Sequence, residues 1–309
     1  MSHLELVEDA VHVRAPAKVN LSLRCGALDE DGYHPLVTTF QAVSLFEEVT
    51  ARPGEGVSVS VSGPQAGLVP TGPENLAARA ALLLAEHVGV EPNVALHLRK
   101  GVPVAGGMAG GSADAAAALL ACDALWRTGL SREELMELGS ALGADVPFAL
   151  LGHTAVGRGR GDVLTPVLAR GTFHWAFAIR ESGLSTPEVY RRFDELTEGT
   201  ANLEDEEVEH ELMLALRRGD PEALGEALHN DLEPAALTLA PELEEVLDVA
   251  REAGALGVLV SGSGPTVAAL GRSAQHVLAI SAAIGAAGVA DEVRTATGPV
   301  PGAILVSRS

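Results

Sequence analysis

The chain has 309 residues, 47% of them hydrophobic, which is enough material to bury the cores of two domains. Its formal net charge of −21 argues against a nucleic-acid partner, because most of the surface would repel a phosphate backbone. No apolar run approaches the roughly 20 residues that span a bilayer, and the first residues, M-S-H-L-E-L-V-E-D, are acidic where a signal peptide is basic. We therefore expect a globular, cytoplasmic protein with no membrane partner.

The lysines and the cysteines indicate which kinds of functional site this chain can contain. Lys18 and Lys100 are the only lysines, and every other strongly basic residue is an arginine. A lysine in so arginine-rich a chain indicates a need for a compact ammonium, which we assign to Lys18 and leave open for Lys100. Cys25 and Cys122 are the only cysteines, so we expect buried thiols rather than a disulfide or a metal site.

The N-terminal part of the chain predicts mainly strands. Residues 11–24 alternate apolar and polar side chains at both ends around Pro16, which predicts a strand that is interrupted near Lys18. Residues 25–36 are rich in turn formers. The elements expected next are strands at 37–45, 57–62 and 94–100 and a helix over 75–88.

Four glycines crowd the segment 103–114, directly ahead of an alanine-rich helix predicted over 112–126. Glycine has no Cβ, so such a loop can bring its N–H groups close to an oxyanion, and a helix N-terminus also favours negative charge. The segment therefore predicts a phosphate site, with Ser112 or Asp114 as the helix cap. The alternative is a turn that only packs a strand against a helix. Ser112 stands where a Walker A loop has lysine, and 106–111 does not spell G-x-G-x-x-G.

A further helix is predicted to begin after Ser131, where S-R-E-E forms a capping box with Glu134, and to end at Gly143. Asp145 precedes Pro147 by two residues, and proline is favoured in the first turn of a helix. Asp145 is therefore expected at or near another helix N-terminus.

The run G-R-G-R-G at 157–161 predicts a flexible junction, and we divide the chain behind it into domains 1–163 and 164–309. In the second half, the acidic segment 204–211 predicts a solvent-facing helix surface. The other elements expected there are a strand at 173–179, a helix capped by Ser185 or Thr186, helices at 221–229, 241–253 and 273–286, strands on both sides of a loop at 261–265, and two short final strands.

Three motifs in order connect these elements to a known family: A-P-A-K-V-N-L at 15–21, P-V-A-G-G-M-A-G-G-S-A at 103–113 and V-S-G-S-G-P-T at 260–266. The set resembles the GHMP kinase superfamily over nearly the whole chain. The resemblance implies a two-domain α+β fold with the active site in the cleft between the domains. The details D-G-Y-H at 31–34 and G-A-D-V-P-F at 143–148 resemble the branch that uses ATP to phosphorylate a hydroxyl on the methylerythritol part of a CDP-linked substrate, in the non-mevalonate route to isoprenoid precursors.

The resemblance assigns ATP binding to the glycine loop. The loop departs from the family's frequent G-L-G-S-S, since Met108 replaces leucine and Ser112 is its only hydroxyl. Mg²⁺ is expected as the usual companion of ATP, and the sequence identifies no protein ligand for it. The residues assigned to ATP are Pro103, Val104, Ala105, Gly106, Gly107, Met108, Ala109, Gly110, Gly111, Ser112 and Ala113.

The resemblance also assigns the chemistry. Asp145 would be the base that accepts the hydroxyl proton, and Lys18 its cationic neighbour, which would keep the carboxylate ionised and offset charge on the transferring group. The alternative for Asp145 is a plain helix cap. Asn20, two residues beyond Lys18, would share its strand face and hydrogen-bond the substrate.

The substrate site implied by the family begins with Tyr33, which would stack on cytosine, and His34, which would present hydrogen-bonding groups to the edge of the base. Tyr190 would close the other side of the base, and Thr186 would reach the substrate. The alternatives are purely structural roles: a local apolar contact for Tyr33, core packing for Tyr190 and a helix cap for Thr186. A second loop of small residues would lie against the glycine loop and the substrate. The alternative is a loop that only connects two strands tightly. Its residues are Ser261, Gly262, Ser263 and Gly264.

Two other functions compete with this interpretation. One is a GHMP-type kinase for homoserine or a mevalonate-type alcohol, against which D-G-Y-H argues because only a nucleotide-linked substrate needs a base-stacking site. The other is a nucleotide-binding module without catalysis, against which the presence of both Lys18 and Asp145 argues. No pattern in the sequence determines an oligomeric state.

Overall fold

The structure is a computed structural model and describes residues 10–30, 32–181, 183–201, 203 and 210–308. Its strands are β1 (Val11–Cys25), β2 (Leu36–Arg52), β3 (Val57–Ser62), β4 (Val94–Arg99), β5 (Thr154–Arg158), β6 (Val163–Pro166), β7 (Phe173–Ile179), β8 (His229–Asn230), β9 (Gly257–Val260), β10 (Val267–Gly271), β11 (Glu292–Gly298) and β12 (Ile304–Arg308). Its helices are α1 (Leu76–Val88), α2 (Gly110–Trp126), α3 (Arg132–Ser140), α4 (Val146–Leu151), α5 (Thr186–Thr197), α6 (His210–Arg218), α7 (Pro221–Glu226), α8 (Glu233–Leu239), α9 (Glu242–Glu252) and α10 (Ala274–Ala287), with a short 3-10 turn at Ala66–Leu68.

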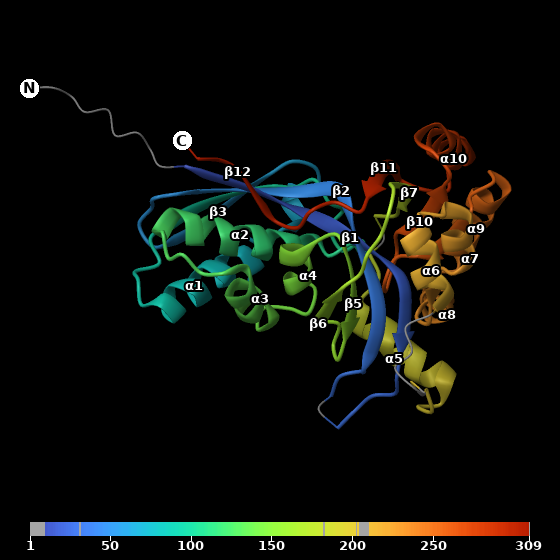
Figure 1. The fold of residues 1–309 in the computed structure, drawn as a ribbon, viewed down its shortest axis with the longest axis horizontal. Coiled ribbons are helices and arrows are strands. Elements are labelled where there is room, and N and C mark those ends of the chain that lie inside the picture. The colour runs from blue at the N-terminus through green and yellow to red at the C-terminus, as the bar shows by residue number, and fades with distance from the viewer. Residues whose placement is uncertain (1–9, 31, 182, 202, 204–209, 309) are drawn as a thin grey trace, which may run out of the picture.

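Within the described ranges these strands form two sheets that lie side by side (Figure 1). The larger, eight-stranded sheet has the order β12-β1-β2-β4-β3, with β5 paired to β2, β6 to β5 and β8 to β1. The smaller sheet has the order β11-β7-β10-β9. Helices α1 to α4 lie beneath the larger sheet in this view, and α6 to α10 surround the smaller one.

Helix α2 is buried because its side chains are small. The four alanines 115–118 are all fully buried, so α2 packs between the larger sheet, α1 and α4. A helix that is apolar on every side belongs in a core. This packing holds the N-terminus of α2, and the glycine loop ahead of it, at a fixed place beside the sheet.

Strand β7 lies between two cores, which explains its nearly continuous apolar sequence. Ala176 and Ala178 face a core made with α5, α8, α9 and α10, whereas Phe173, Trp175 and Phe177 face a core made with α6, α7 and the middle of β1. Successive strand side chains point to opposite faces, so a strand buried on both faces has no polar side.

The long strands β1 and β2 run past both halves of the molecule and bend between them (Figure 1). Their register shifts between Pro16 and Ala17 and again between Asn20 and Ser22. The predicted interruption near Lys18 is therefore a pair of local irregularities within one strand. Proline has no N–H to donate to the ladder, which accounts for the first shift.

Most predicted helices and strands are confirmed, and so is the capping box at Ser131. Cys25 and Cys122 are buried, free thiols, as expected. The helix expected over 221–229 ends at Glu226, because residues 229–230 pair with β1 as β8. The strands β5, β6 and β8 and the helix α8 were not predicted from the sequence. Within the described part of the chain, no helix has the length and apolar character needed to cross a membrane.

The run G-R-G-R-G is not a loose junction, which corrects the sequence interpretation. Its first two residues end β5 and the other three lie in the turn of the β5–β6 hairpin, and β6 (Val163–Pro166) joins the larger sheet. Strand β12 also returns to the larger sheet from the C-terminal end. The division at 163/164 stays a prediction. Of the acidic segment 204–211, residues 204–209 lie outside the described residues.

Candidate active site

A cavity of about 420 Å³ brings together parts of the chain that are far apart in sequence. It lies among β1, the glycine loop, the loop before α4, the start of α5 and the loop between β9 and β10. The predicted site residues that line it are Lys18, Asn20, Pro103, Ala105, Gly106, Gly107, Ala109, Gly110, Gly111, Ser112, Asp145, Thr186, Tyr190, Gly262 and Ser263. Val104, Met108, Ala113, Ser261 and Gly264 do not line it, and Met108 and Ala113 are fully buried.

The start of α2 differs from the prediction. The N-cap is Ala109, at φ 61° and without a side-chain cap, so Ser112 and Asp114 are inside the helix and neither caps it. The first intrahelical bond is donated by the N–H of Ala113 to the carbonyl of Ala109. The N–H groups of the three residues between them therefore have no partner within the helix, and all three residues line the cavity. This is the arrangement that binds anions at helix N-termini.

Gly107 lets the two small-residue loops touch. Its φ is +72°, and a Cβ there would lie 2.2 Å from the carbonyl oxygen of Ser261. The hydroxyl of Ser261 donates to the carbonyl of Gly107 at 3.3 Å, and the N–H of Lys18 donates to the carbonyl of Met108 at 3.2 Å. The glycine loop is thus tied to β1 on one side and to the 261–264 loop on the other.

Lys18 and Asp145 face each other across the cavity. The Nζ of Lys18 lies 3.9 Å from the Oδ2 of Asp145 and donates to the Oδ1 of Asn20 at 2.7 Å. Asn20 in turn donates to the hydroxyl of Thr38 at 2.8 Å, and that hydroxyl donates to the carbonyl of Ser22 at 2.7 Å. The chain of hydrogen bonds fixes the amide of Asn20, which places the ammonium.

Asp145 occupies the N-cap position of α4, but its side chain makes no capping hydrogen bond. Its side chain is 31% exposed, whereas that of Lys18 is 9% exposed. The plain-cap alternative is therefore not what the geometry shows. The carboxylate is oriented by an ammonium and is accessible from the cavity, as a group that accepts a proton must be.

A second cavity, of about 650 Å³, adjoins the first and is lined by Tyr33, His34 and Tyr190. The two cavities share lining residues, which makes them parts of one cleft: Leu36, Ala144, Arg160, Thr186 and Tyr190. Tyr33 is 53% exposed at its rim. Burial raises the pKa of the Tyr190 hydroxyl, so this ring stays neutral.

His34 is held by α5. Its Nε2 lies 2.9 Å from the Oδ1 of Asp194, and its ring centroid is 4.9 Å from that of Tyr190. The hydroxyl of Thr186 lies 2.9 Å from that of Ser263, so Thr186 links α5 to the 261–264 loop. It does not cap α5, whose N-cap position belongs to Ser185, without a side-chain bond.

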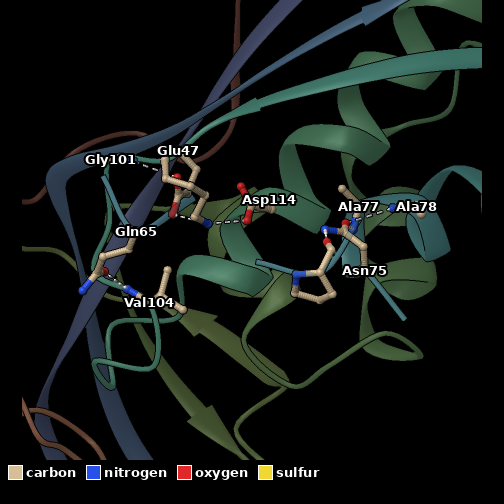
Figure 2. Close-up of polar contacts among 10 residues, drawn as sticks. Glu47, Gln65, Asn75, Ala77, Ala78, Gly101, Val104 and Asp114 are labelled. Atoms are coloured by element: carbon tan, nitrogen blue, oxygen red, sulfur yellow. Dashed lines mark hydrogen bonds and ion pairs between the residues drawn. The ribbon is translucent and has the colours of Figure 1, made fainter. Parts of the chain in front are cut away.

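Lys100, for which the sequence indicated no role, belongs to a buried cluster with Glu47 and Asp114, both of which are labelled in Figure 2. Its Nζ lies 2.6 Å from the Oε1 of Glu47 and pairs with Asp114 of α2, and the Oε2 of Glu47 accepts from the N–H of Gly101 at 2.9 Å. Lys100 stands just before the glycine loop in sequence, Asp114 follows the loop, and Glu47 lies in β2. One ammonium therefore connects both ends of the loop to β2.

The charges of this cluster shift one another. Burial and the neighbouring Asp114 raise the pKa of Glu47 to about 7, in spite of Lys100. Burial also raises the pKa of Asp114. Burial lowers the pKa of Lys100, but the two carboxylates outweigh it and raise this pKa, so the amine stays charged.

A third cavity, of about 240 Å³, lies on the far side of the loop and shares Ala105, Gly110 and Gly111 with the first. Val104 lines it, and the N–H of Val104 donates to the Oε1 of Gln65 at 2.9 Å (Figure 2). Asn75 lines it as well and caps α1 by accepting from Ala77 and Ala78. The described residues contain no group of three or more side chains suited to hold a metal ion.

The family models of the GHMP kinases match this chain in both halves. The N-terminal domain model matches residues 75–153, and the C-terminal domain model matches residues 212–290. A curated relative, the 4-diphosphocytidyl-2-C-methyl-D-erythritol kinase of Streptomyces coelicolor, is 52% identical over 298 residues, which cover 96% of this chain and 99% of the relative. This chain belongs to the GHMP kinase family.

Solved structures of GHMP kinases have the same fold as this chain. A crystal structure of 4-(cytidine 5'-diphospho)-2C-methyl-D-erythritol kinase matches with a TM-score of 0.74 and 36% identity, covering 93% of this chain and 98% of that one. The homoserine kinase of Cytophaga hutchinsonii matches with a TM-score of 0.75 at 21% identity, over 99% of this chain and 100% of that one, and so shows the fold alone. The predicted two-domain α+β GHMP kinase fold is confirmed.

Proposed function

We propose that this GHMP kinase transfers the γ-phosphoryl group of ATP to a hydroxyl on the methylerythritol part of 4-diphosphocytidyl-2-C-methyl-D-erythritol. The observation that carries the proposal is the placement of the Lys18–Asp145 pair in one cavity with the glycine loop, next to a cavity lined by Tyr33, His34 and Tyr190. The 52% identical relative bears the name of this kinase. We assign the reaction to the cytoplasm, with small molecules as its partners.

The reaction needs alignment and charge neutralisation more than covalent help from the protein. The substrate hydroxyl oxygen attacks the γ-phosphorus while the bond from that phosphorus to the β,γ-bridging oxygen breaks, which releases ADP. The hydroxyl proton passes to the carboxylate of Asp145. The ammonium of Lys18 holds Asp145 ionised before the transfer and stabilises negative charge on the moving group.

ATP would place its phosphates over the N-terminus of α2, where Gly110, Gly111 and Ser112 present N–H groups outside the helical ladder. The third cavity opens from the same glycines and offers room for the nucleoside. Mg²⁺ would bind mainly through the phosphates and water, as it commonly does with nucleotides, with the Ser112 hydroxyl and the Asp145 carboxylate as the nearby protein oxygens.

The cytosine would lie in the second cavity. A carboxylate accepts hydrogen bonds, so the contact with Asp194 makes Nε2 of His34 the donor, and in a neutral ring Nδ1 is then an acceptor. An acceptor suits the exocyclic amine of cytosine. Tyr33 and Tyr190 would provide the stacking surfaces on which single bases are usually held.

The test is an assay of the purified chain with ATP and Mg²⁺, in which ADP formation is followed with 4-diphosphocytidyl-2-C-methyl-D-erythritol, homoserine or mevalonate as the acceptor. We expect turnover with the CDP-linked alcohol alone. Comparable turnover of either other alcohol would assign the chain to that kinase, and ATP binding without turnover of any of them would leave a binding module.

A further inference from the structure

The turn of the β5–β6 hairpin reaches the boundary between the first and second cavities, and Arg160 at its tip lines both. The backbone of this turn is tightly held. The N–H of Leu36 donates to the carbonyl of Gly159 at 2.7 Å, and a Cβ on Gly157 would lie 2.5 Å from the carbonyl of Gly161. Gly159 and Gly161 have φ of +66° and +96°, which glycine adopts at little cost. Three of the five residues in the run are thus needed to set Arg160 in this place.

The side chain of Arg160 is 43% exposed and contacts two neighbouring side chains. Its guanidinium carbon lies 5.0 Å from the centroid of the Tyr33 ring, and its Nη2 lies 3.2 Å from the Oδ2 of Asp162. A guanidinium has five N–H donors, so its contacts with Asp162 and Tyr33 still leave donors for a ligand. The arginine is therefore anchored next to the proposed base site with part of its fork available.

Few cations line the cleft of this strongly acidic protein. Among the described lining residues of the first two cavities they are Lys18, Arg160 and Arg191. Lys18 is held between Asn20 and Asp145. Arg191 lines the second cavity but not the first, and its guanidinium lies 2.5 Å from the carboxylate of Glu195. Arg160 is the cation that both cavities share. With a net charge of −21, a dianionic ligand depends on such local positive charge.

We propose that Arg160 binds the diphosphate that joins the cytidine to the methylerythritol part of the substrate. This inference rests on the proposed function, which puts the base in the second cavity and the reacting hydroxyl at Asp145 in the first. The linking diphosphate must then cross the boundary at which Arg160 lies. Arginine binds phosphate oxygens through two parallel N–H bonds, so Arg160 sets how far the hydroxyl extends toward Asp145.

The test compares CDP with cytidine as competitive ligands of the full chain, because the two differ only in the diphosphate. Dissociation constants are measured by calorimetry for the wild type, Arg160→Gln and Arg160→Lys. For Arg160→Gln we expect CDP to bind about 10-fold more weakly, the lower end for a charge-assisted hydrogen bond, since the site is partly exposed. Cytidine should bind all three proteins alike, and Arg160→Lys should fall between the others for CDP.

A matched control removes one positive charge elsewhere. Arg99→Gln alters a side chain that is 68% exposed and lines none of the three cavities, and its CDP affinity should equal that of the wild type. Equal weakening of CDP and cytidine in Arg160→Gln would overturn the inference, because Arg160 would then act on the base through Tyr33. An unchanged CDP affinity in Arg160→Gln would overturn it as well. If the wild type itself binds CDP no better than cytidine and does not phosphorylate the CDP-linked alcohol, the proposed function fails.

Discussion

The Nζ of Lys18 lies 3.9 Å from the Oδ2 of Asp145, although one residue comes from the first strand and the other from the N-cap position of α4. Lys18 is buried, and the carboxylate of Asp145 accepts no hydrogen bond from the backbone of α4. Both side chains line the first cavity. We therefore expect substitutions of Asp145 and of Lys18 to lower activity for different reasons.

Asp145→Asn should lower kcat by about 10²-fold or more, which is the usual scale for the loss of a general base. The variant should fold normally, because the carboxylate caps no helix and is 31% exposed. Turnover with the CDP-linked alcohol and thermal unfolding measure the two effects. Near-normal kcat in a folded Asp145→Asn protein would remove Asp145 from the chemistry.

Lys18→Met should lower kcat by about 10²-fold, as expected for the loss of one preorganised charge beside the transferring group. Lys18→Arg should show most of this loss although the charge is kept, because a planar guanidinium does not fit where a compact ammonium lies 2.7 Å from Asn20. Steady-state kinetics of both variants provide the check, and full activity of Lys18→Arg would mean that only the charge matters.

Tyr33→Ala should raise the KM for the CDP-linked substrate by about 5- to 150-fold, since stacking of a base on an aromatic ring is worth roughly 1–3 kcal/mol. The KM for ATP should change little, because the glycine loop and Tyr33 line different cavities. Tyr33→Phe keeps the ring and is the matched control, expected within a few-fold of the wild type. Equal damage by Phe and Ala would point to the hydroxyl instead of the ring.

Gly107→Ala should destabilise the protein by about 1–3 kcal/mol, because the residue has φ +72° and the new Cβ would lie 2.2 Å from the carbonyl of Ser261. Gly111→Ala in the same segment is the control. Its Cβ would meet only Leu76 at 3.4 Å, and alanine favours a helix by about 1 kcal/mol over glycine, so stability should be equal or higher. Urea unfolding of both variants tests this contrast, which is absent if the two loops do not touch in solution.

Glu47→Gln should change how stability depends on pH. The pKa of Glu47 is about 7 in the folded protein and 4.5 ordinarily, so between these values the folded state holds more protons than the unfolded state. The free energy of unfolding contributed by Glu47 is therefore highest below the ordinary pKa and falls as pH rises through the folded one. The wild type should lose more stability than Glu47→Gln between about pH 4 and pH 8, as measured by urea unfolding. Parallel pH profiles for the two proteins would contradict the raised pKa.

Local patterns were enough to predict much of this fold. The start of α3 follows from the capping box of Ser131 and Glu134, and the start of α1 from Asn75, because each helix end is satisfied by atoms within three residues. Lys18 and Asn20 were expected on one strand face, and their hydrogen bond confirms it. The resemblance of three motifs then led to the family, which the comparisons confirm.

Other features depend on residues that meet only when the chain folds. Helix α2 begins before its expected cap, and Asp114 instead pairs with Lys100, whose ammonium also pairs with Glu47 of β2. The sequence near Asp114 carries no sign of Glu47. The turn around Arg160 was taken for a flexible junction because its glycines suggest freedom, whereas packing against β2 holds them. Likewise β8 is two residues long and exists because β1 pairs with it. By itself the sequence determined the elements whose ends are satisfied locally, while the tertiary structure decided the ion pairs and strand pairings between distant segments, whose energies depend on contacts that no local window contains.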